Sequence, residues 1–231
     1  MSQQPVPFSR AVSVRQMQRL DEAAIHTIGI PRLLLMDAAG RAVAQMVREL
    51  IPAPAQELLI CCGLGYNGGD GLCAAWYLAR WGYQPRVILA GERGRLKDEP
   101  AVYARILEGN GVRLHEVAIA KQADAVAERM SRAQGIIDAL LGIGLQGPVK
   151  PLTSSLINLI NQSGKPVVAA DIPSGLDADS GFPNPVAVKA TITVTFGLPK
   201  QGLLIGEGPA HTGRLIVDDI GMPTSLLKQL A

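Results

Sequence analysis

The feature that most constrains this sequence is an alternation between short apolar runs and longer segments with helical periodicity. Candidate strands lie at residues 58–62, 86–90, 112–117, 136–139, 166–170, 191–196 and 215–218, and candidate helices at 71–81, 98–108, 122–132 and 153–162. Strands that are apolar throughout and alternate with helices are typical of a parallel sheet covered on both faces. The pattern therefore predicts an α/β fold with a mostly parallel central sheet. The last two runs have no clear helix between them, so the final strands are free to depart from strict alternation.

Two additional helices are expected before the first strand. Ser13 and Gln16 have the spacing of a capping box, and an apolar stripe follows at Val14, Met17, Leu20, Ala24, Ile25 and Ile28. Pro31 stands near the start of the second helix, a favourable place for proline, and Pro52 ends it. We expect both helices to pack onto the α/β domain as an added layer.

Length, charge and cysteine content exclude several classes of protein. The 231 residues fit one large α/β domain, and 48% hydrophobic residues supply ample material for its core. A net charge of +2 with no dense basic cluster argues against a nucleic-acid or membrane-surface role. Three cysteines (Cys61, Cys62 and Cys73) do not form a disulfide framework, and the adjacent pair lacks zinc-site spacing. With no apolar signal sequence and no run near the roughly 20 residues of a membrane span, we expect a cytoplasmic protein.

Ligands of open parallel sheets bind outside the carboxyl ends of the strands, so the residues that follow each strand are the most informative. The first strand is followed by GLGYNGGDG at residues 63–71, whose five glycines permit tight turns and close backbone approach to a ligand. Alone, this pattern fits an ordinary dinucleotide loop or a turn without a ligand. Asn67 and Asp70 indicate something beyond pyrophosphate, such as a cation or a polar ring. Gly91, not an acidic residue, stands directly at the tip of the second strand, which weakens the dehydrogenase interpretation.

Two further segments follow neighbouring strands. Asp138 is followed by a second glycine-rich loop at residues 139–147, and Asp171 opens the segment DIPSG at 171–175. Pro173 restricts that segment and Gly175 frees it again, which would direct Asp171 and Ser174 into the space of the two loops. The structural alternatives are that residues 139–147 form a loop without a ligand and that Asp171 caps its own turn. We expect a shared pocket.

The oxygen-bearing residues in these segments suggest two kinds of chemistry. Asn67, Asp138 and Ser174 offer oxygen ligands to a hard cation, and with one certain negative charge we favour a monovalent ion over magnesium. Asp171 is then the best candidate for proton transfer, since carboxylates in pockets act as acids or bases. The three histidines, His26, His115 and His211, follow none of these strands and are expected to be surface or hydrogen-bonded side chains.

Together with TFGLPKQGL at residues 195–203, these segments resemble the NAD(P)H-hydrate epimerases, also called YjeF N-terminal domain proteins. The resemblance runs from about Ala11 to Gly221, and four motifs in the same order make it specific. It implies that residues 1–231 form one domain, a Rossmann-like three-layer α/β/α sandwich that is often a homodimer. The implied activity is interconversion of the R and S epimers of NADHX and NADPHX, which carry a hydroxyl at C6 of the damaged nicotinamide ring. A partner dehydratase then acts on the S form, and it would be a separate protein if the chain ends naturally at Ala231.

The resemblance also implies roles for individual residues. One potassium ion per subunit would be bound by Asn67, Asp138 and Ser174. Substrate would be bound by Tyr66, Asn67, Gly68, Gly69, Asp70, Gly142, Ile143, Gly144, Leu145, Gln146, Gly147, Pro148 and Asp171. The family usually has two asparagines before the paired glycines, and Tyr66 replaces the first. Lys200 is expected either to approach the substrate phosphates or to be an exposed loop lysine.

The hypothesis for the mechanism places Asp171 at the centre of proton transfer. Protonated Asp171 would help hydroxide leave C6, the ring nitrogen would stabilise an iminium ion, and water would return to either face with Asp171 as base. Two alternatives remain: a non-catalytic nucleotide-binding or scaffold module on the same fold, and an NAD(P)-dependent oxidoreductase. The second lacks a paired Tyr and Lys at catalytic spacing. Fold alone does not decide between these functions.

Overall fold

The computed structural model describes residues 10–52, 57–119, 124–145 and 147–229. Its centre is one seven-stranded sheet in the order β3-β2-β1-β4-β5-β6-β7, and every neighbouring pair is parallel. The strands are β1 (Glu57–Cys62), β2 (Gln84–Ala90), β3 (Leu114–Val117), β4 (Gly135–Ala139), β5 (Val167–Ala170), β6 (Ile192–Phe196) and β7 (Arg214–Asp218). All seven predicted strands are confirmed, with no end displaced by more than two residues. The last two strands remain parallel although only a short helix lies between them.

The helices are α1 (Val14–Glu22), α2 (Arg32–Leu50), α3 (Tyr66–Arg80), α4 (Asp98–Gly109), α5 (Asp124–Arg132), α6 (Pro151–Gln162), α7 (Gly208–Thr212) and α8 (Thr224–Leu227). A π-helical turn, η1 (Ala23–Thr27), extends α1, and 3-10 turns lie at η2 (Arg93–Arg95) and η4 (Gln201–Leu203). Within the described ranges, no helix combines the length and the apolar character needed to cross a membrane.

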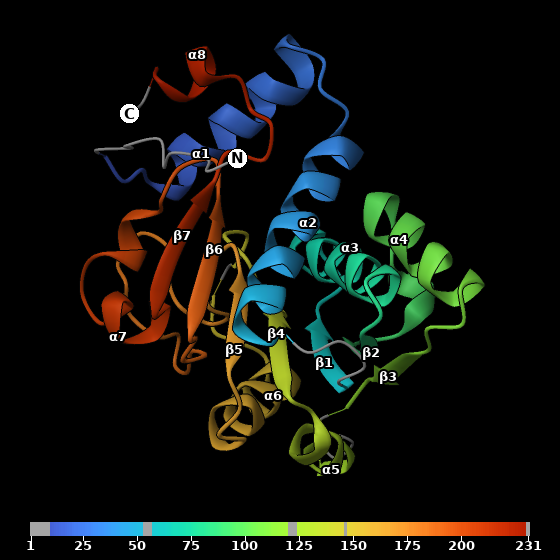
Figure 1. The fold of residues 1–231 in the computed structure, drawn as a ribbon. Coiled ribbons are helices and arrows are strands. Elements are labelled where there is room, and N and C mark those ends of the chain that lie inside the picture. Colours follow the sequence, from blue (N-terminus) through green and yellow to red (C-terminus); the bar gives the residue numbers. More distant parts are fainter. Residues whose placement is uncertain (1–9, 53–56, 120–123, 146, 230–231) are drawn as a thin grey trace.

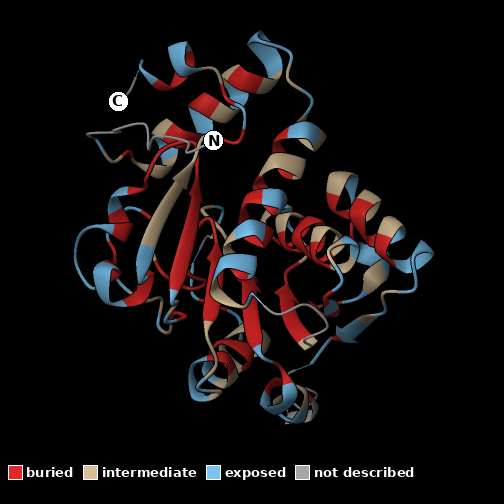
Figure 2. Cartoon of the chain, in the orientation of Figure 1, coloured by how far each residue is buried: buried red, intermediate tan, exposed pale blue. Residues whose placement is uncertain are grey.

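Helices cover both faces of the sheet, as Figure 1 shows. Successive side chains of a strand point to opposite faces, so Ile60 and Cys62 join the core beneath α2, α3 and α4, whereas Leu59 and Cys61 join the core beneath α5 and α6. The central strands are buried and the outer surfaces of the helices are exposed (Figure 2). The architecture is therefore the predicted α/β/α sandwich. The three cysteines are free, as expected without a disulfide framework, and all three are buried.

The two N-terminal helices are present, and their positions refine the prediction. The capping box of α1 is confirmed, because the Gln16 amide donates to Ser13 Oγ and the Ser13 amide donates to Gln16 Oε1. The α2 helix packs against α3, β5 and β6, so it is one of the helices that cover the sheet. Backbone hydrogen bonds join Val12 to Pro199 and to Gln201, which anchors the start of α1 beside the segment that follows β6.

The α3 helix begins at Tyr66, five residues before the predicted start at Gly71, so the prediction of a loop over residues 66–70 is wrong. The glycines there serve close packing within a helix. A Cβ at Gly68 would lie 2.0 Å from the Gly63 carbonyl oxygen, and a Cβ at Gly71 would lie 2.5 Å from the Cβ of Ala139. Because these positions lack side chains, the N-terminus of α3 sits directly against the ends of β1 and β4.

Strand order reverses between β1 and β4. From β1 the chain proceeds outward to β2 and β3, and then returns to place β4 on the other side of β1. The two connections leave the sheet in opposite directions at this point, which opens a crevice at the carboxyl ends of the two strands. Gly63 follows β1 and Leu140 follows β4, so both glycine-rich segments begin at this crevice.

Candidate active site

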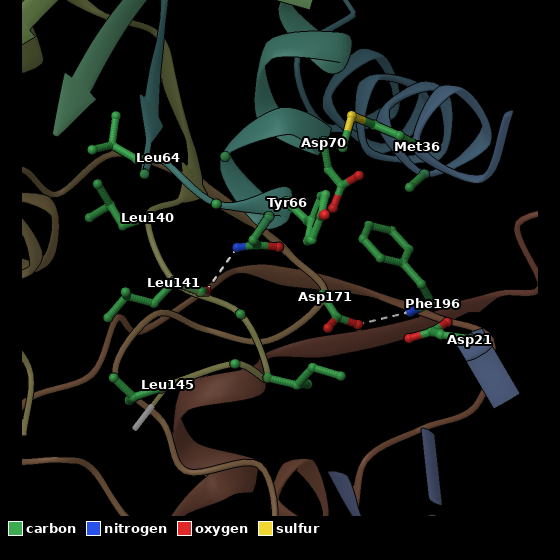
Figure 3. A pocket seen from close by; sticks show the side chains of 18 of the residues that line it. Asp21, Met36, Leu64, Tyr66, Asp70, Leu140, Leu141, Leu145, Asp171 and Phe196 are labelled. Atoms are coloured by element: carbon green, nitrogen blue, oxygen red, sulfur yellow. Dashed lines mark hydrogen bonds between the residues drawn. The ribbon is translucent and has the colours of Figure 1, made fainter. Parts of the chain in front are cut away.

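A cavity of about 990 Å³ lies at the carboxyl ends of β1, β4 and β5. Its walls come from residues 63–68 and Asp70, from residues 140–145, and from Asp171. The α1 and α2 helices close one side with Asp21, Glu22, Arg32 and Met36. Figure 3 shows these segments surrounding one space, with Asp70 from α3 on one side and Asp171 across from it. The shared pocket expected from the sequence is therefore present.

Most of the residues predicted to bind substrate line this cavity: Tyr66, Asn67, Gly68, Asp70, Gly142, Ile143, Gly144, Leu145, Pro148 and Asp171. Gly69 does not line it, because its Cα faces α2 and α4; a Cβ there would meet Met36 and Pro100. Gly147 is also absent from the described lining, and Gln146 lies outside the described residues.

Asp138 and Ser174 lie fully buried beneath the pocket floor and are joined by short hydrogen bonds. The Ser174 hydroxyl is 2.6 Å from Asp138 Oδ1, and the Ser174 amide donates to Asp138 Oδ2 at 2.8 Å. The Leu141 amide donates to Ser174 Oγ at 2.8 Å, which ties the second glycine-rich loop to the DIPSG segment. Burial raises the pKa of Asp138 to about 6, against the opposing effect of the hydrogen bonds from Ser174 and Leu140.

Asn67 completes this arrangement from the start of α3. Its Nδ2 donates to the Leu141 carbonyl at 2.8 Å, a bond visible in Figure 3, whereas its buried Oδ1 has no hydrogen-bond partner. An unpaired buried acceptor costs free energy unless a donor or a cation occupies the adjacent space. The described residues contain no cluster of three His, Cys, Asp or Glu ligands. A cation here would therefore rely on amide, hydroxyl and carbonyl oxygens with Asp138, the donor set of a hard ion of low charge.

Asp171 stands in a left-handed backbone conformation, with φ 64°, directly after β5. This conformation is uncommon outside glycine and is typical of functional positions. The Asp171 amide donates to the Val194 carbonyl at 2.7 Å, and Oδ1 accepts from the Phe196 amide at 3.2 Å and from Thr195 Oγ1 at 3.4 Å. The neighbouring strand β6 therefore fixes the side chain at the pocket wall.

Lys200 has a contact with Asp171 that the sequence did not predict. Its side chain is 1% exposed, so of the two alternatives for Lys200 the exposed loop lysine is wrong. Nζ contacts Asp171 Oδ1 at 2.5 Å, Thr195 Oγ1 at 3.1 Å and the Phe196 carbonyl at 2.8 Å. The Val12–Pro199 and Gln201–Val12 backbone bonds hold this segment beneath α1, which explains the burial. The clue in the sequence was a lysine within the matched segment TFGLPKQGL.

Known proteins share the sequence pattern and the fold of this chain. The family model described as YjeF-related protein N-terminus matches residues 32–202. The chain belongs to this family. The yeast protein YNL200c, a solved structure, superimposes with a TM-score of 0.82 at 22% identity, covering 96% of this chain and 93% of that one, which shows the same fold.

The sequence relatives of this YjeF-related domain are of two lengths. A protein of Limosilactobacillus fermentum named NAD(P)H-hydrate epimerase is 37% identical over 92% of this chain and 98% of its own length. A Coxiella burnetii protein named bifunctional NAD(P)H-hydrate repair enzyme is 39% identical over 93% of this chain, but over only 42% of its own length. The chain thus spans about two fifths of the bifunctional relatives.

Two further carboxyl groups line the pocket of this YjeF-related domain. Asp21, which sequence reasoning did not single out, comes from α1, and its pKa is raised to about 6, chiefly by burial. Burial and the charges of Asp171 and Asp21 raise the pKa of Asp70 well above its usual range, and Lys200 opposes this only in part. Glu22 also lines the cavity, so its described lining holds four carboxyl groups, and three of these, Asp21, Asp70 and Asp171, interact electrostatically with the buried Lys200.

Tyr66 stands where the family usually has asparagine. Its ring is 46% exposed at the pocket lining, the Arg32 guanidinium carbon lies 4.5 Å from the ring centroid, and Arg32 Nη1 donates to the tyrosine hydroxyl at 2.5 Å. Stacking of this kind fixes an arginine in place. Of the histidines, His26 and His115 are exposed and His211 is hydrogen-bonded to the Val188 carbonyl, as predicted.

Proposed function

We propose that this chain is an NAD(P)H-hydrate epimerase that interconverts the R and S epimers of NADHX and NADPHX. The observation that carries the proposal is the convergence of both glycine-rich segments and Asp171 on one large cavity at the topological switch point. A relative matched over nearly its whole length bears the name NAD(P)H-hydrate epimerase, which supports the same conclusion.

The pocket supplies groups for the two ends of such a substrate. The N-terminus of α3 at Tyr66–Gly68 presents free amide N–H groups and the positive end of a helix dipole, which suit a pyrophosphate. Asp171 stands at the opposite wall, where a hydrated nicotinamide ring would place C6. Loss of the C6 hydroxyl is assisted by the ring nitrogen, which forms an iminium ion, and return of water to the other face gives the other epimer. Carboxyl groups at the wall move the protons.

Potassium is the proposed cation, with Asn67, Asp138 and Ser174 as its side-chain ligands. The unpartnered Oδ1 of Asn67 is the observation that favours an ion at this point. Such an ion would supply positive charge that holds the two glycine-rich segments and the DIPSG segment together. The residues themselves shape the pocket floor through the Asp138–Ser174–Leu141 hydrogen bonds.

The test is interconversion of purified R- and S-NADHX, followed by chromatography with potassium present and absent. Rapid equilibration by the wild-type protein is expected, and epimers that relax no faster than without protein would refute the activity. Asp171→Asn should lower the rate by about 10²–10⁴-fold, because one positioned proton-transfer group is lost. Retained full activity in Asp171→Asn would remove Asp171 from proton transfer. Because this variant leaves Lys200 without its anion, the control for folding is a native circular dichroism spectrum under the assay conditions.

The proposal extends to the oligomeric state, the cellular compartment and the partner enzyme. We propose a homodimer in the cytoplasm that works with an ADP- or ATP-dependent NAD(P)H-hydrate dehydratase. This chain matches only about two fifths of the bifunctional relatives, so the rest of those proteins can carry a second activity. Light scattering of the purified protein tests the dimer, and recovery of NADH from R-NADHX with added dehydratase tests the coupling.

A further inference from the structure

The hydrogen bonds around Lys200 determine the charge of Asp171. An ammonium group has three N–H donors, and the Nζ of Lys200 has three acceptors, on Asp171, Thr195 and Phe196. A buried ammonium is stable only beside an anion, and Asp171 is the carboxyl group in contact with it. Asp171 Oδ1 also accepts from the Phe196 amide. In the resting pocket Asp171 is therefore a carboxylate, ready to accept a proton and unable to give one.

Departure of hydroxide from C6 needs a proton donor, and Asp70 is the group in position to be one. Asp70 is half-buried on α3 and lines the same cavity. Burial and the charges of other groups act on its carboxyl group, and among the described residues no hydrogen-bond donor does. Figure 3 shows it reaching into the pocket from the side opposite Asp171.

Three charged groups and two thiols surround Asp70. Asp171 and Asp21 disfavour its ionisation, Lys200 favours it, and the thiols of Cys62 and Cys73 stay neutral because burial raises their pKa. The net result is a raised pKa for Asp70. Asp21 is less suited to be the acid, since the positive charges of Lys200 and Arg32 both favour its ionised form.

We propose that Asp70 and Asp171 form an acid–base pair across the pocket, with Asp70 protonating the oxygen that leaves C6 and Asp171 deprotonating the water that adds. This inference rests on the proposed epimerase function and divides between two residues the roles that a single aspartate would otherwise hold.

The steps balance without an oxidant or reductant. The C6–O bond breaks, its electron pair stays on oxygen, and that oxygen takes the Asp70 proton and becomes water. The lone pair of the ring nitrogen forms the C6=N iminium bond. A water molecule then forms the new C6–O bond on the other face, the iminium electrons return to nitrogen, and the released proton goes to Asp171. The pair is now protonated on the opposite member, which is the form needed for the reverse reaction, and exchange with pocket water restores the first form.

The experiment is the pH profile of kcat/KM for NADHX epimerisation in wild type, Asp70→Asn and Asp171→Asn. In wild type the rate falls at high pH as Asp70 loses its proton. Asp70→Asn is expected to lose about 10²–10⁴-fold in kcat/KM and to lack this high-pH fall. Asp171→Asn is expected to lose activity as well, but to keep the high-pH fall. Asp98→Asn, at an exposed position outside the cavity, should match wild type.

Wild-type kcat/KM and an unchanged high-pH fall in Asp70→Asn would overturn the assignment. Should that variant fold poorly by circular dichroism, Asp70→Glu replaces it. This variant retains the acid and should recover activity with a displaced high-pH fall, and an undisplaced fall would also overturn the inference. An inactive wild type would instead refute the proposed function, so the two failures are distinguishable.

Discussion

At the scale of single residues, the Asp171–Lys200 pair dominates the site. The two side chains are 29 positions apart in the sequence and both are nearly excluded from water. A buried charge whose partner is removed is far more costly than the intact pair is stabilising. The pair therefore makes the stability of the fold depend on the same atoms that the proposed reaction uses.

Lys200→Met is expected to lower the free energy of unfolding by about 3–5 kcal/mol, because it leaves the Asp171 carboxylate buried without its cation. Denaturant unfolding at pH 7 measures the loss. The double variant Lys200→Met/Asp171→Asn should recover part of it, since neither charge remains. If both variants unfolded at the same denaturant concentration as wild type, the pair would not be the charge balance that the hydrogen bonds indicate.

The pKa of Asp21 gives a prediction with a defined sign. Burial raises it to about 6 in the folded protein, above the ordinary value of 3.8, so folding favours the protonated form. This stabilisation is complete below about pH 3.8 and is lost as the pH rises through about 6. The free energy of unfolding of Asp21→Asn, taken relative to that of wild type, should therefore be larger at pH 8 than at pH 4. We expect a gain of about 1 kcal/mol, because pocket water screens the charge and reduces the effect of the raised pKa.

Urea unfolding of wild type and Asp21→Asn at the two pH values measures this gain. Comparing the variant with wild type at each pH cancels the titration of Asp70 and Asp138, which both proteins share. An advantage for the variant that was larger at pH 4 than at pH 8 would contradict the assigned direction.

At the scale of elements, α3 joins packing to function. Its first turn forms the pocket wall, yet its glycines are set by contacts with Gly63, Met36 and Ala139. The amide groups of that turn can face a ligand only because the helix approaches the strand ends this closely. The same few residues therefore serve both helix packing and the pocket wall. A substitution that moves α3 away from the strand ends would also displace the amide groups that face the ligand.

Gly68→Ala tests this dependence. A Cβ at Gly68 would lie 2.0 Å from the Gly63 carbonyl oxygen, so the backbone must move, and we expect a loss of about 1–3 kcal/mol in the free energy of unfolding. Gly65→Ala is the matched control, because Gly65 has an ordinary φ of −89° and open space around it. That variant should stay within about 0.5 kcal/mol of wild type. Equal effects at the two positions would mean that α3 does not depend on this contact.

At the scale of the whole molecule, the switch point and the proposed cation join distant parts of the chain. Asn67 lies in the first turn of α3, Asp138 lies near the end of β4, and Ser174 follows β5. Hydrogen bonds connect Asn67 and Ser174 to Leu141, and Asp138 to Leu140 and Ser174. An ion that binds only the folded arrangement stabilises the entire domain by mass action.

Potassium should raise the unfolding midpoint at constant ionic strength, by the equivalent of about 2.7 kcal/mol at a concentration 100 times its Kd. Differential scanning fluorimetry with tetramethylammonium as the replacement ion measures the effect. Asn67→Leu should abolish it by removing the unpartnered oxygen, whereas Asn110→Leu, at an exposed position, should retain it. The same potassium response in wild type and Asn67→Leu would place the ion elsewhere.

Much of the fold was predictable from the sequence because the signals are local. Each strand is a continuous apolar run, and burial on both faces of the sheet requires that pattern, so strand positions were correct within two residues. The segments at the strand ends were predictable for a related reason: parallel strands bring their carboxyl ends to one edge. Asn67, Asp138, Asp171 and Ser174 were singled out in this way, and the structure gathers them at or just beneath the pocket.

Only the tertiary structure decided what depends on contacts between distant segments. The sequence left open whether Lys200 approaches the substrate phosphates or is an exposed loop lysine. Its burial against Asp171 follows from the tertiary structure, in which Val12 pairs with the backbone on both sides of Lys200. Asp21 entered the pocket because α1 packs over the segment after β6, and α3 began early because its glycines fit the strand ends. The local sequence pattern determines which segments are helical or extended and which of their faces are apolar. Burial and charge pairing depend on contacts between elements that are distant in the sequence, and these contacts determine the chemistry of the site.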